Sequence, residues 1–168
     1  FMDVKGNNQP TFVAHSMGSF AAQHVAAHAP TRVRKLVLLG SATTSRNAVM
    51  LELEKEVNAL SDPLPAKFVS DFQVSTTFQP MSADFLRRVI SESLKCDANT
   101  WKGVIAAHVD LNNAAALSKV KMPTLILWGD KDSIFSRNEQ ELLVKAIPGS
   151  VLKVYAQTGH AIHWERPN

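Results

Sequence analysis

Three residue types that act together in nucleophilic catalysis occur in order along the chain: Ser16, Asp132 and His160. A serine hydroxyl is a weak nucleophile until a histidine accepts its proton, and that histidine needs a carboxylate to hold its ring and tautomer. The three stand in the segments "VAHSMGS", "LWGDKDSIF" and "TGHAIHWERP". Their types and order therefore predict acyl transfer through a covalent serine intermediate.

The surroundings of Ser16 predict a sharp turn between a strand and a helix. A short apolar run over residues 11–16 has the composition of a buried strand, and an alanine-rich helix is expected over residues 17–29. The head of a helix presents free backbone N–H groups, so we expect the N–H of Met17 where an oxyanion would form.

Small residues flank the serine at the spacing of a nucleophile elbow. Ala14 and Gly18 stand two residues before and two residues after Ser16. A turn tight enough to push the hydroxyl outward is expected to leave no room for larger side chains at these places. The pattern matches G-x-S-x-G, with alanine in the first glycine position.

The elements that must position the other two residues are further strands. Near-continuous apolar runs over residues 34–40, 124–129 and 151–156 alternate with helical patterns, which predicts an α/β fold with a mostly parallel four-stranded sheet. Asp132 follows the third of the four strands and His160 the fourth. Both are therefore expected at the carboxyl edge, where parallel α/β sheets build their sites.

A long helical insertion is expected between the second and third strands. Residues 42–118 give successive helix patterns without strand patterns. We therefore predict a helical cap over 42–118 and a core made of residues 1–41 and 119–168.

The segments "VAHSMGS", "MPTLILWGDKD" and "TGHAIHWERP" resemble the α/β-hydrolase superfamily, in its esterase, lipase and haloperoxidase-like branch. The order serine, acid, base is that of this superfamily and not of chymotrypsin or subtilisin. The resemblance implies that Ser16 is the nucleophile, Asp132 the acid and His160 the base, with Met17 N–H in the oxyanion hole. Asp130 is the rival acid, but the family pattern uses the second aspartate of "GDKD".

The activity that this resemblance implies is hydrolysis of carboxylic esters, with short acyl chains favoured. A lactonase, a carbon–carbon bond hydrolase or a perhydrolase would use the same residues. The elbow serine argues against haloalkane dehalogenases and epoxide hydrolases, which place aspartate there. Two competing hypotheses are a ligand receptor that keeps the triad and a catalytically weak fragment that only folds.

Candidate pocket residues are less specific than the triad. Five ring-bearing side chains are candidates for the walls of a substrate pocket: His15, Phe72, Phe78, Trp101 and Phe135. The competing interpretation is packing in the core for the four aromatic residues and a structural role beside Ser16 for His15. His163 lies one helical turn from His160 and is interpreted as packing around the site.

The resemblance also implies elements that this chain does not show ahead of the elbow strand. Relatives carry several strands and helices there, including a loop, often beginning His-Gly, that gives the second oxyanion N–H. Residues 1–6 are expected to form the last turn of a helix. We therefore expect the chain to correspond to the C-terminal portion of a hydrolase, with modest activity toward small activated esters. The strand at 11–16 is expected to have an unpaired edge through which a homo-oligomer forms.

Composition excludes several other classes of partner. The chain has 168 residues and a net charge of +3 without a cluster of lysine and arginine, so nucleic acid and anionic membranes are not expected partners. No apolar run reaches the length that spans a membrane, and no leader pattern opens the chain. The lone Cys96 excludes an internal disulfide and favours a reducing, cytoplasmic location.

No cofactor or metal is expected. His24 and His28 have the i, i+4 spacing of a zinc-binding pair, but Val25 stands where the zincin motif has glutamate. A solvated helix face is the favoured interpretation of this pair.

Overall fold

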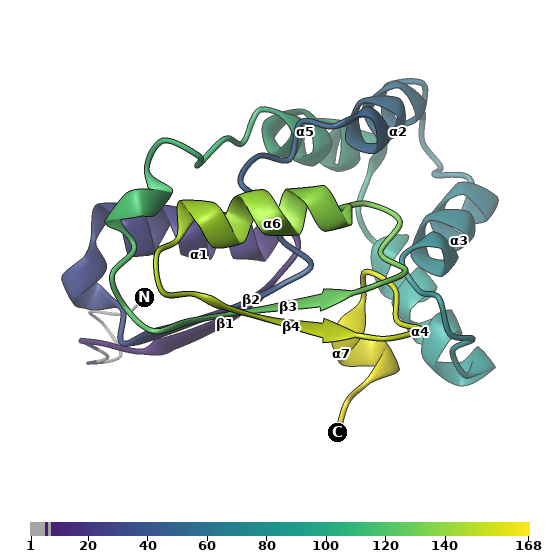
Figure 1. Ribbon diagram of the computed structural model, residues 1–168. Coiled ribbons are helices and arrows are strands. Elements are labelled where there is room, and N and C mark those ends of the chain that lie inside the picture. Colours follow the sequence, from purple (N-terminus) through teal and green to yellow (C-terminus); the bar gives the residue numbers. More distant parts are fainter. Residues whose placement is uncertain (1–5, 7) are drawn as a thin grey trace.

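The computed structural model describes residue 6 and residues 8–168, so the expected helix turn over residues 1–6 lies, apart from Gly6, outside the described residues. Four parallel strands form one sheet in the order of the chain, as Figure 1 shows. Their bounds are β1 (Thr11–His15), β2 (Lys35–Leu39), β3 (Thr124–Gly129) and β4 (Val151–Tyr155). The predicted α/β class with a parallel four-stranded sheet is confirmed.

Two long helices cover one face of this sheet, and a short helix lies on the opposite side (Figure 1). The long helices are α1 (Met17–His28) and α6 (Arg137–Ala146), and the short one is α7 (Ile162–Glu165). Helix α6 begins at a complete capping box, in which the side chains and backbone N–H groups of Ser136 and Glu139 bond reciprocally. Two short 3-10 turns complete the core: η1 (Pro30–Arg32) and η2 (Leu117–Lys119).

The main hydrophobic core lies between the sheet and these two long helices. Alternate side chains of each strand point toward α1 and α6, as expected from the two-residue period of a strand. The fully buried members of this cluster come from both helices, from the strands and from η2: Ala26, Leu38, Leu117, Ile126, Leu143 and Ile147.

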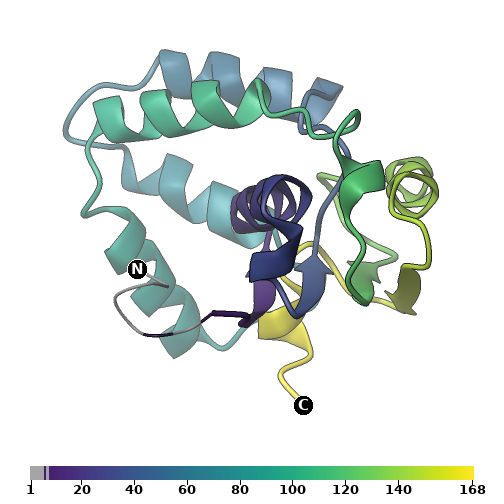
Figure 2. The ribbon, with the colours of Figure 1, turned by 90° about the vertical axis from the view of Figure 1, so that its left-hand side faces the viewer.

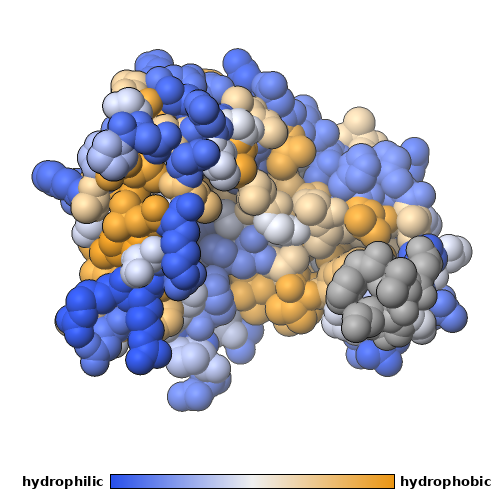
Figure 3. All heavy atoms as spheres, turned by 180° about the vertical axis from the view of Figure 1, so that it is seen from behind, coloured by the Kyte–Doolittle hydropathy of each residue, from blue (hydrophilic) through white to orange (hydrophobic). Residues whose placement is uncertain are grey.

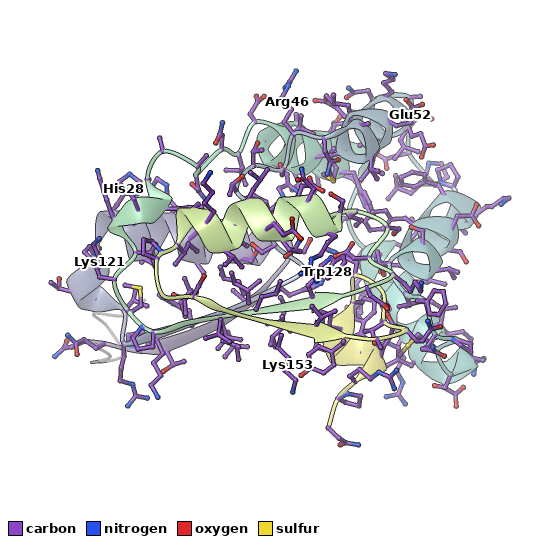
Figure 4. All side chains as sticks on the ribbon, viewed as in Figure 1. His28, Arg46, Glu52, Lys121, Trp128 and Lys153 are labelled. Atoms are coloured by element: carbon purple, nitrogen blue, oxygen red, sulfur yellow. The ribbon has the colours of Figure 1, made fainter. Side chains whose placement is uncertain are left out.

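The opposite face of the sheet carries a row of aliphatic side chains in register. Val13 pairs with Val37, Val37 with Leu125 and Leu125 with Val151. The outer two are well exposed, Val13 at 69% and Val151 at 62%. Lys153 projects from this same side of β4, away from α6 (Figure 4). Within the described residues, this face is covered only in part.

Strand β1 forms one edge of the sheet, because β2 is its only partner among the described residues. Figure 3 looks at the molecule from the side of β1 and shows hydrophobic surface there, with a hollow between the core and the helical insertion. The unpaired edge expected for this strand is therefore present in the described part of the chain. Whether it mediates self-association stays a prediction.

Four helices make up the insertion between β2 and β3, which projects beyond one end of the sheet (Figures 1 and 2). Polar side chains cap three of them: Asn47, Ser82 and Asp97 each accept a hydrogen bond from a backbone N–H in the first turn. The bounds are α2 (Ala48–Asn58), α3 (Ala66–Ser75), α4 (Ala83–Ser93) and α5 (Ala98–Val109). Helices α2, α3 and α5 share a buried apolar cluster of their own.

The two ends of the insertion meet at an isolated antiparallel bridge between Thr44 and Asn112. The insertion is thus helical except for this bridge, close to the expectation for residues 42–118. Its treatment as a separate cap domain stays a prediction. The strands and helices otherwise end within about one residue of their expected bounds, because caps and turns decide the last residue.

Candidate active site

Ser16 occupies a strained backbone position between β1 and α1. Its φ of 50° and ψ of −126° lie in a region that residues with a side chain rarely adopt. Its N–H donates to the carbonyl of Leu39 at 3.0 Å, and its own carbonyl accepts from Ser19 N–H at 2.8 Å. The strand and the helix thereby fix the turn from both sides.

A buried polar network lies directly beneath this turn. Ser19 Oγ lies 2.5 Å from the Ser16 carbonyl oxygen and 2.6 Å from Ser41 Oγ. Gln23 donates to Ser41 Oγ at 2.8 Å, and Gln140 donates to the Ser41 carbonyl at 2.9 Å. All four network side chains are fully buried. These hydrogen bonds hold the backbone of the turn from the buried side.

Gly18 corrects the steric argument made from the sequence. A Cβ added at Gly18 would meet no atom within 4 Å, so a larger side chain has room there in the described structure. Ala14, by contrast, packs against the main core. The neighbouring Met17 is 45% exposed. The start of α1 is therefore open at Met17 and Gly18.

Asp132 and His160 form a buried pair at the carboxyl ends of β3 and β4. His160 Nδ1 donates to Asp132 Oδ2 at 3.0 Å, and their side chains are 2% and 0% exposed. The other oxygen of Asp132 accepts the N–H groups of Ile134 at 2.8 Å and Phe135 at 3.0 Å. Asp130, the rival acid, is exposed and does not contact the histidine. The carboxylate is thus held by its own loop before it meets the imidazole.

The imidazole of His160 rests against Gly40 at the end of β2. A Cβ added at Gly40 would lie 2.8 Å from two atoms of that ring, and the φ of Gly40 is +52°. Phe135 packs on the ring with a centroid distance of 5.6 Å. Glycine at this position lets the imidazole and the strand end approach closely.

His15 supports the same residue from the other side. Its Nε2–H donates to the His160 carbonyl at 3.1 Å, and its ring lies 4.7 Å from the ring of His160 and 4.4 Å from that of His163. Burial lowers the pKa of His15 to about 3, and the neighbouring histidines add to this effect. Burial also lowers the pKa of His163. At neutral pH, His15 is therefore an uncharged donor that holds the His160 backbone.

Glu165 of α7 ties the insertion to the His160 loop. Its carboxylate accepts the N–H groups of Gly159 at 2.8 Å, Gln79 at 2.8 Å and Phe78 at 3.2 Å. Phe78 and Gln79 belong to the segment between α3 and α4, whereas Gly159 directly precedes the histidine. This contact was missed at the level of sequence, because nothing in a lone glutamate shows which distant N–H groups it will accept.

The two halves of the site are not joined by a hydrogen bond. His160 Nε2 is buried and has no partner among the described residues, so the Ser16 hydroxyl is not bonded to it. Donation of Nδ1–H to Asp132 leaves Nε2 with the lone pair of a neutral imidazole. The ring thus presents a proton acceptor at the carboxyl ends of the strands, where the elbow serine also lies.

A cavity of about 250 Å³ borders the serine. Of the five expected pocket residues, Phe72 and Trp101 contribute to its wall, whereas His15, Phe78 and Phe135 do not. His15 and Phe135 instead contact His160, and Phe78 is 47% exposed. The remaining wall comes from the elbow and from the region of α5: Ser16, Met17, Cys96, Thr100, Val104, Ile105 and His108.

Apart from Trp101, the α5 residues of this wall were not anticipated, because their position depends on how the insertion folds back over the elbow. The only local signal is that Ile105 and His108 lie three residues apart, on one face of a helix. A larger cavity of about 540 Å³ lies between α2 and α3 and does not reach Ser16.

No cluster of three or more histidine, cysteine, aspartate or glutamate side chains that could hold a metal ion occurs in the described residues. His24 and His28 stack on each other with ring centroids 4.1 Å apart. In the part of the chain that the structure describes, no helix has the length and apolar character needed to cross a membrane.

Comparisons with known proteins point to one family. A family model described as alpha/beta hydrolase fold matches residues 1–167. Lipase 1 of Psychrobacter immobilis is 26% identical over 154 residues, which cover 87% of this chain and 48% of the lipase. The 2-hydroxy-6-oxononadienedioate/2-hydroxy-6-oxononatrienedioate hydrolase 2 of Pseudomonas putida is 23% identical over 180 residues, which cover 98% of this chain and 60% of that enzyme. The chain thus spans about half to three-fifths of these relatives.

Solved structures share the fold. An esterase from Exiguobacterium antarcticum superposes with a TM-score of 0.85 at 20% identity, covering 99% of this chain and 65% of the esterase. The enol-lactonase from Burkholderia xenovorans LB400 gives a TM-score of 0.81 at 17% identity, covering 99% of this chain and 64% of the lactonase. At these identities the likeness concerns the fold alone.

Proposed function

Because the chain belongs to the alpha/beta hydrolase fold family, we propose that it is a serine hydrolase that cleaves carboxylic esters through Ser16, His160 and Asp132. One observation carries the proposal. A serine on strained backbone borders a cavity at the same sheet edge as a buried Asp132–His160 pair whose Nε2 is unoccupied. Strain and a paired acid and base are the features expected of an activated nucleophile.

The proposed reaction has two stages. In the first, His160 Nε2 takes the hydroxyl proton as Ser16 Oγ attacks the ester carbonyl, and the same proton then passes to the leaving alcohol. In the second, His160 Nε2 takes a proton from water as the water oxygen attacks the acyl-enzyme. The proton then passes to Ser16 Oγ as the carboxylic acid leaves. Asp132 holds the tautomer that leaves Nε2 free, and its carboxylate stabilises the imidazolium that forms in each stage.

The oxyanion of each tetrahedral intermediate needs donors. Met17 occupies the first position of α1, where a backbone N–H has no partner within the helix. This N–H stands directly after the nucleophile, the place from which this class of turn donates to the oxyanion. In a well-studied protease, loss of one oxyanion donor costs about 10²–10³ in rate, so a site with Met17 alone is expected to be slow.

The cavity favours an uncharged acyl group. Among the residues that the structure describes, no lysine or arginine borders it, and most of its wall is apolar. A substrate carboxylate placed there would be desolvated without a counter-charge, which is unfavourable. This supports a simple ester over the dioates in the name of the Pseudomonas putida relative. A lactone, the substrate class in the name of the Burkholderia structure, is a cyclic ester and would use the same steps.

The test is hydrolysis of nitrophenyl esters from acetate to decanoate by the chain and by its Ser16→Ala variant. We expect turnover that is highest for short to medium uncharged acyl groups and falls to background in the variant. A mono-nitrophenyl ester of a dicarboxylic acid is expected to react more slowly than its uncharged analogue. Equal rates for the parent and Ser16→Ala would overturn the proposal, and a single turnover with a stable adduct would favour the receptor hypothesis.

A further inference from the structure

The wall of the cavity contains one buried polar side chain that the proposed reaction does not use. His108, near the end of α5, is 5% exposed, and this residue borders the cavity together with Ser16 and Met17. Its Nε2 is shut off from solvent and has no hydrogen-bond partner among the described residues. An unsatisfied buried nitrogen is costly, so it calls for an explanation.

The surrounding contacts fix where His108 lies. Its ring meets Phe20 edge-on with a centroid distance of 5.3 Å, and Phe20 is fully buried in α1. Its carbonyl accepts the hydroxyl of Ser45 and the N–H of Leu111. The end of α5 is thereby anchored to the loop after β2. The position of His108 is thus fixed by its neighbours.

The charge state of His108 limits what it can bind. Burial lowers its pKa to about 4, and the nearby His160 adds to the effect. Its imidazole is therefore neutral at pH 7 and offers one N–H donor and one lone pair. A neutral imidazole of this kind suits an uncharged oxygen, such as a hydroxyl, better than a carboxylate or a cation.

We propose that His108 is a specificity residue that recognises an uncharged oxygen on the acyl chain of the substrate. This inference rests on the proposed ester hydrolysis. It includes a small turn of the ring about its Cβ–Cγ bond, because Nε2 is shut off from solvent in the described structure. The preferred substrates are then hydroxyacyl esters. Their hydroxyl can accept a hydrogen bond from the imidazole N–H or donate one to the nitrogen that carries the lone pair.

The catalytic groups that border the cavity indicate that it holds the acyl part of the substrate. Ser16 and Met17, which would bind the carbonyl carbon and the oxyanion, are in its wall, whereas His160 is not. The leaving alcohol must lie beside His160 to receive its proton. The acyl chain is left to run along α5 toward His108. The other polar side chains of the wall beyond the elbow, Cys96 and Thr100, are exposed and can bond to water.

The test compares nitrophenyl hexanoate with its 2-, 3- and 6-hydroxy analogues. For one position of the hydroxyl, we expect kcat/KM to exceed that of hexanoate by about tenfold, the effect of one recovered hydrogen bond in a buried site. In His108→Phe this preference is lost, while hydrolysis of hexanoate itself persists. The same variant is expected to unfold at a higher temperature, because it removes an unpaired buried nitrogen.

Two further variants separate the possible outcomes. Ile105→Leu changes the same helix face without a polar group and is expected to keep the hydroxyl preference. His108→Gln keeps a hydrogen-bonding group and is expected to retain part of it. No hydroxyl preference in the parent, or the same preference in His108→Phe, would overturn this inference. If the parent hydrolyses none of these esters, the result would instead count against the proposed function.

Discussion

The two sides of the candidate site are built very differently. Asp132 and His160 lie in the loops that follow β3 and β4, and their side chains are at most 2% exposed and have partners on several sides. Ser16 and Met17 lie at the end of β1, an edge strand among the described residues, and Met17 is 45% exposed. The proposed acid and base are enclosed, whereas the proposed nucleophile is held through its backbone beside an exposed Met17.

This difference shows which side of the candidate site the described residues hold in place. The loop that follows β3 satisfies the Asp132 carboxylate, and Gly40 and His15 fix the place of His160. On the other side, the buried network around Ser41 fixes the backbone of the elbow but not its surroundings. We therefore expect changes on the enclosed side to be severe and matched changes on the open side to be mild.

The largest expected effect is that of removing the carboxylate. Asp132→Asn is expected to lower kcat by about 10³–10⁴, because the imidazole loses the partner that sets its tautomer. Asp130→Asn, its matched control two residues earlier, is expected to stay within about twofold, as is usual for exposed sites away from the chemistry. Steady-state kinetics on a short nitrophenyl ester measures both. Equal losses in the two variants would remove Asp132 from the role of acid.

Substitution of one glycine on each side of the candidate site allows the two sides to be compared directly. Gly40→Ala places a methyl group against the His160 ring at a positive φ, so we expect a loss of about 2–3 kcal/mol in the free energy of unfolding. Gly18→Ala adds a methyl group to a helix where the space is open, and is expected to be neutral or to gain up to about 1 kcal/mol. Urea denaturation gives both values. A neutral Gly40→Ala would mean that the enclosed side is looser than described.

The buried histidines predict a loss of stability in acid. The pKa values of His15 and His108 are about 3 and about 4 in the folded chain, below the ordinary value of 6.5. The unfolded chain therefore binds more protons between pH 6.5 and these values, and the free energy of unfolding falls as pH drops through that window. After allowance for partial solvation, we expect about 1–2 kcal/mol for each histidine.

Urea denaturation from pH 7.5 to pH 4.5 measures this loss. His108→Phe should make the decline shallower, since one of the two contributions is removed. An unchanged slope in that variant would show that His108 is protonated in the folded chain.

The smallest expected effect concerns the open edge. We propose that the chain self-associates through β1, whose Val13 is 69% exposed in the row of aliphatic side chains. Val13→Lys is expected to weaken the association by about 1 kcal/mol, since charged residues on an edge oppose strand pairing. Val74→Lys, which changes a 48% exposed valine on α3, is the control. Sedimentation of the parent as a monomer at micromolar concentration would contradict the proposal.

The family resemblance and the α/β class could be predicted from the sequence, and both are confirmed. The reason is that the informative residues sit next to strand ends, so local motifs in chain order already indicate a shared edge. The approach of Gly40 to His160 could not be predicted in this way, because it arises from how the end of β2 meets the loop after β4. His108 was missed because its place depends on the packing of the whole insertion.

The aromatic residues show the same limit. Phe72 and Trp101 border the cavity, whereas Phe135 packs beside His160 and Phe20. A ring in a sequence does not show which of two neighbouring cavities or cores it will enter. His15 was expected near the serine, and its hydrogen bond to the His160 carbonyl became visible only once β1 and the His160 loop were placed together.

We propose above that Ser16 is a nucleophile activated by the enclosed pair of Asp132 and His160. Its most direct test is labelling with a fluorophosphonate, followed by mass spectrometry of the digested chain. We expect one covalent phosphonyl group on the peptide that contains Ser16, formed at least about tenfold more slowly in His160→Gln and absent in Ser16→Ala. Labelling at another residue, or an equal rate in His160→Gln, would contradict it.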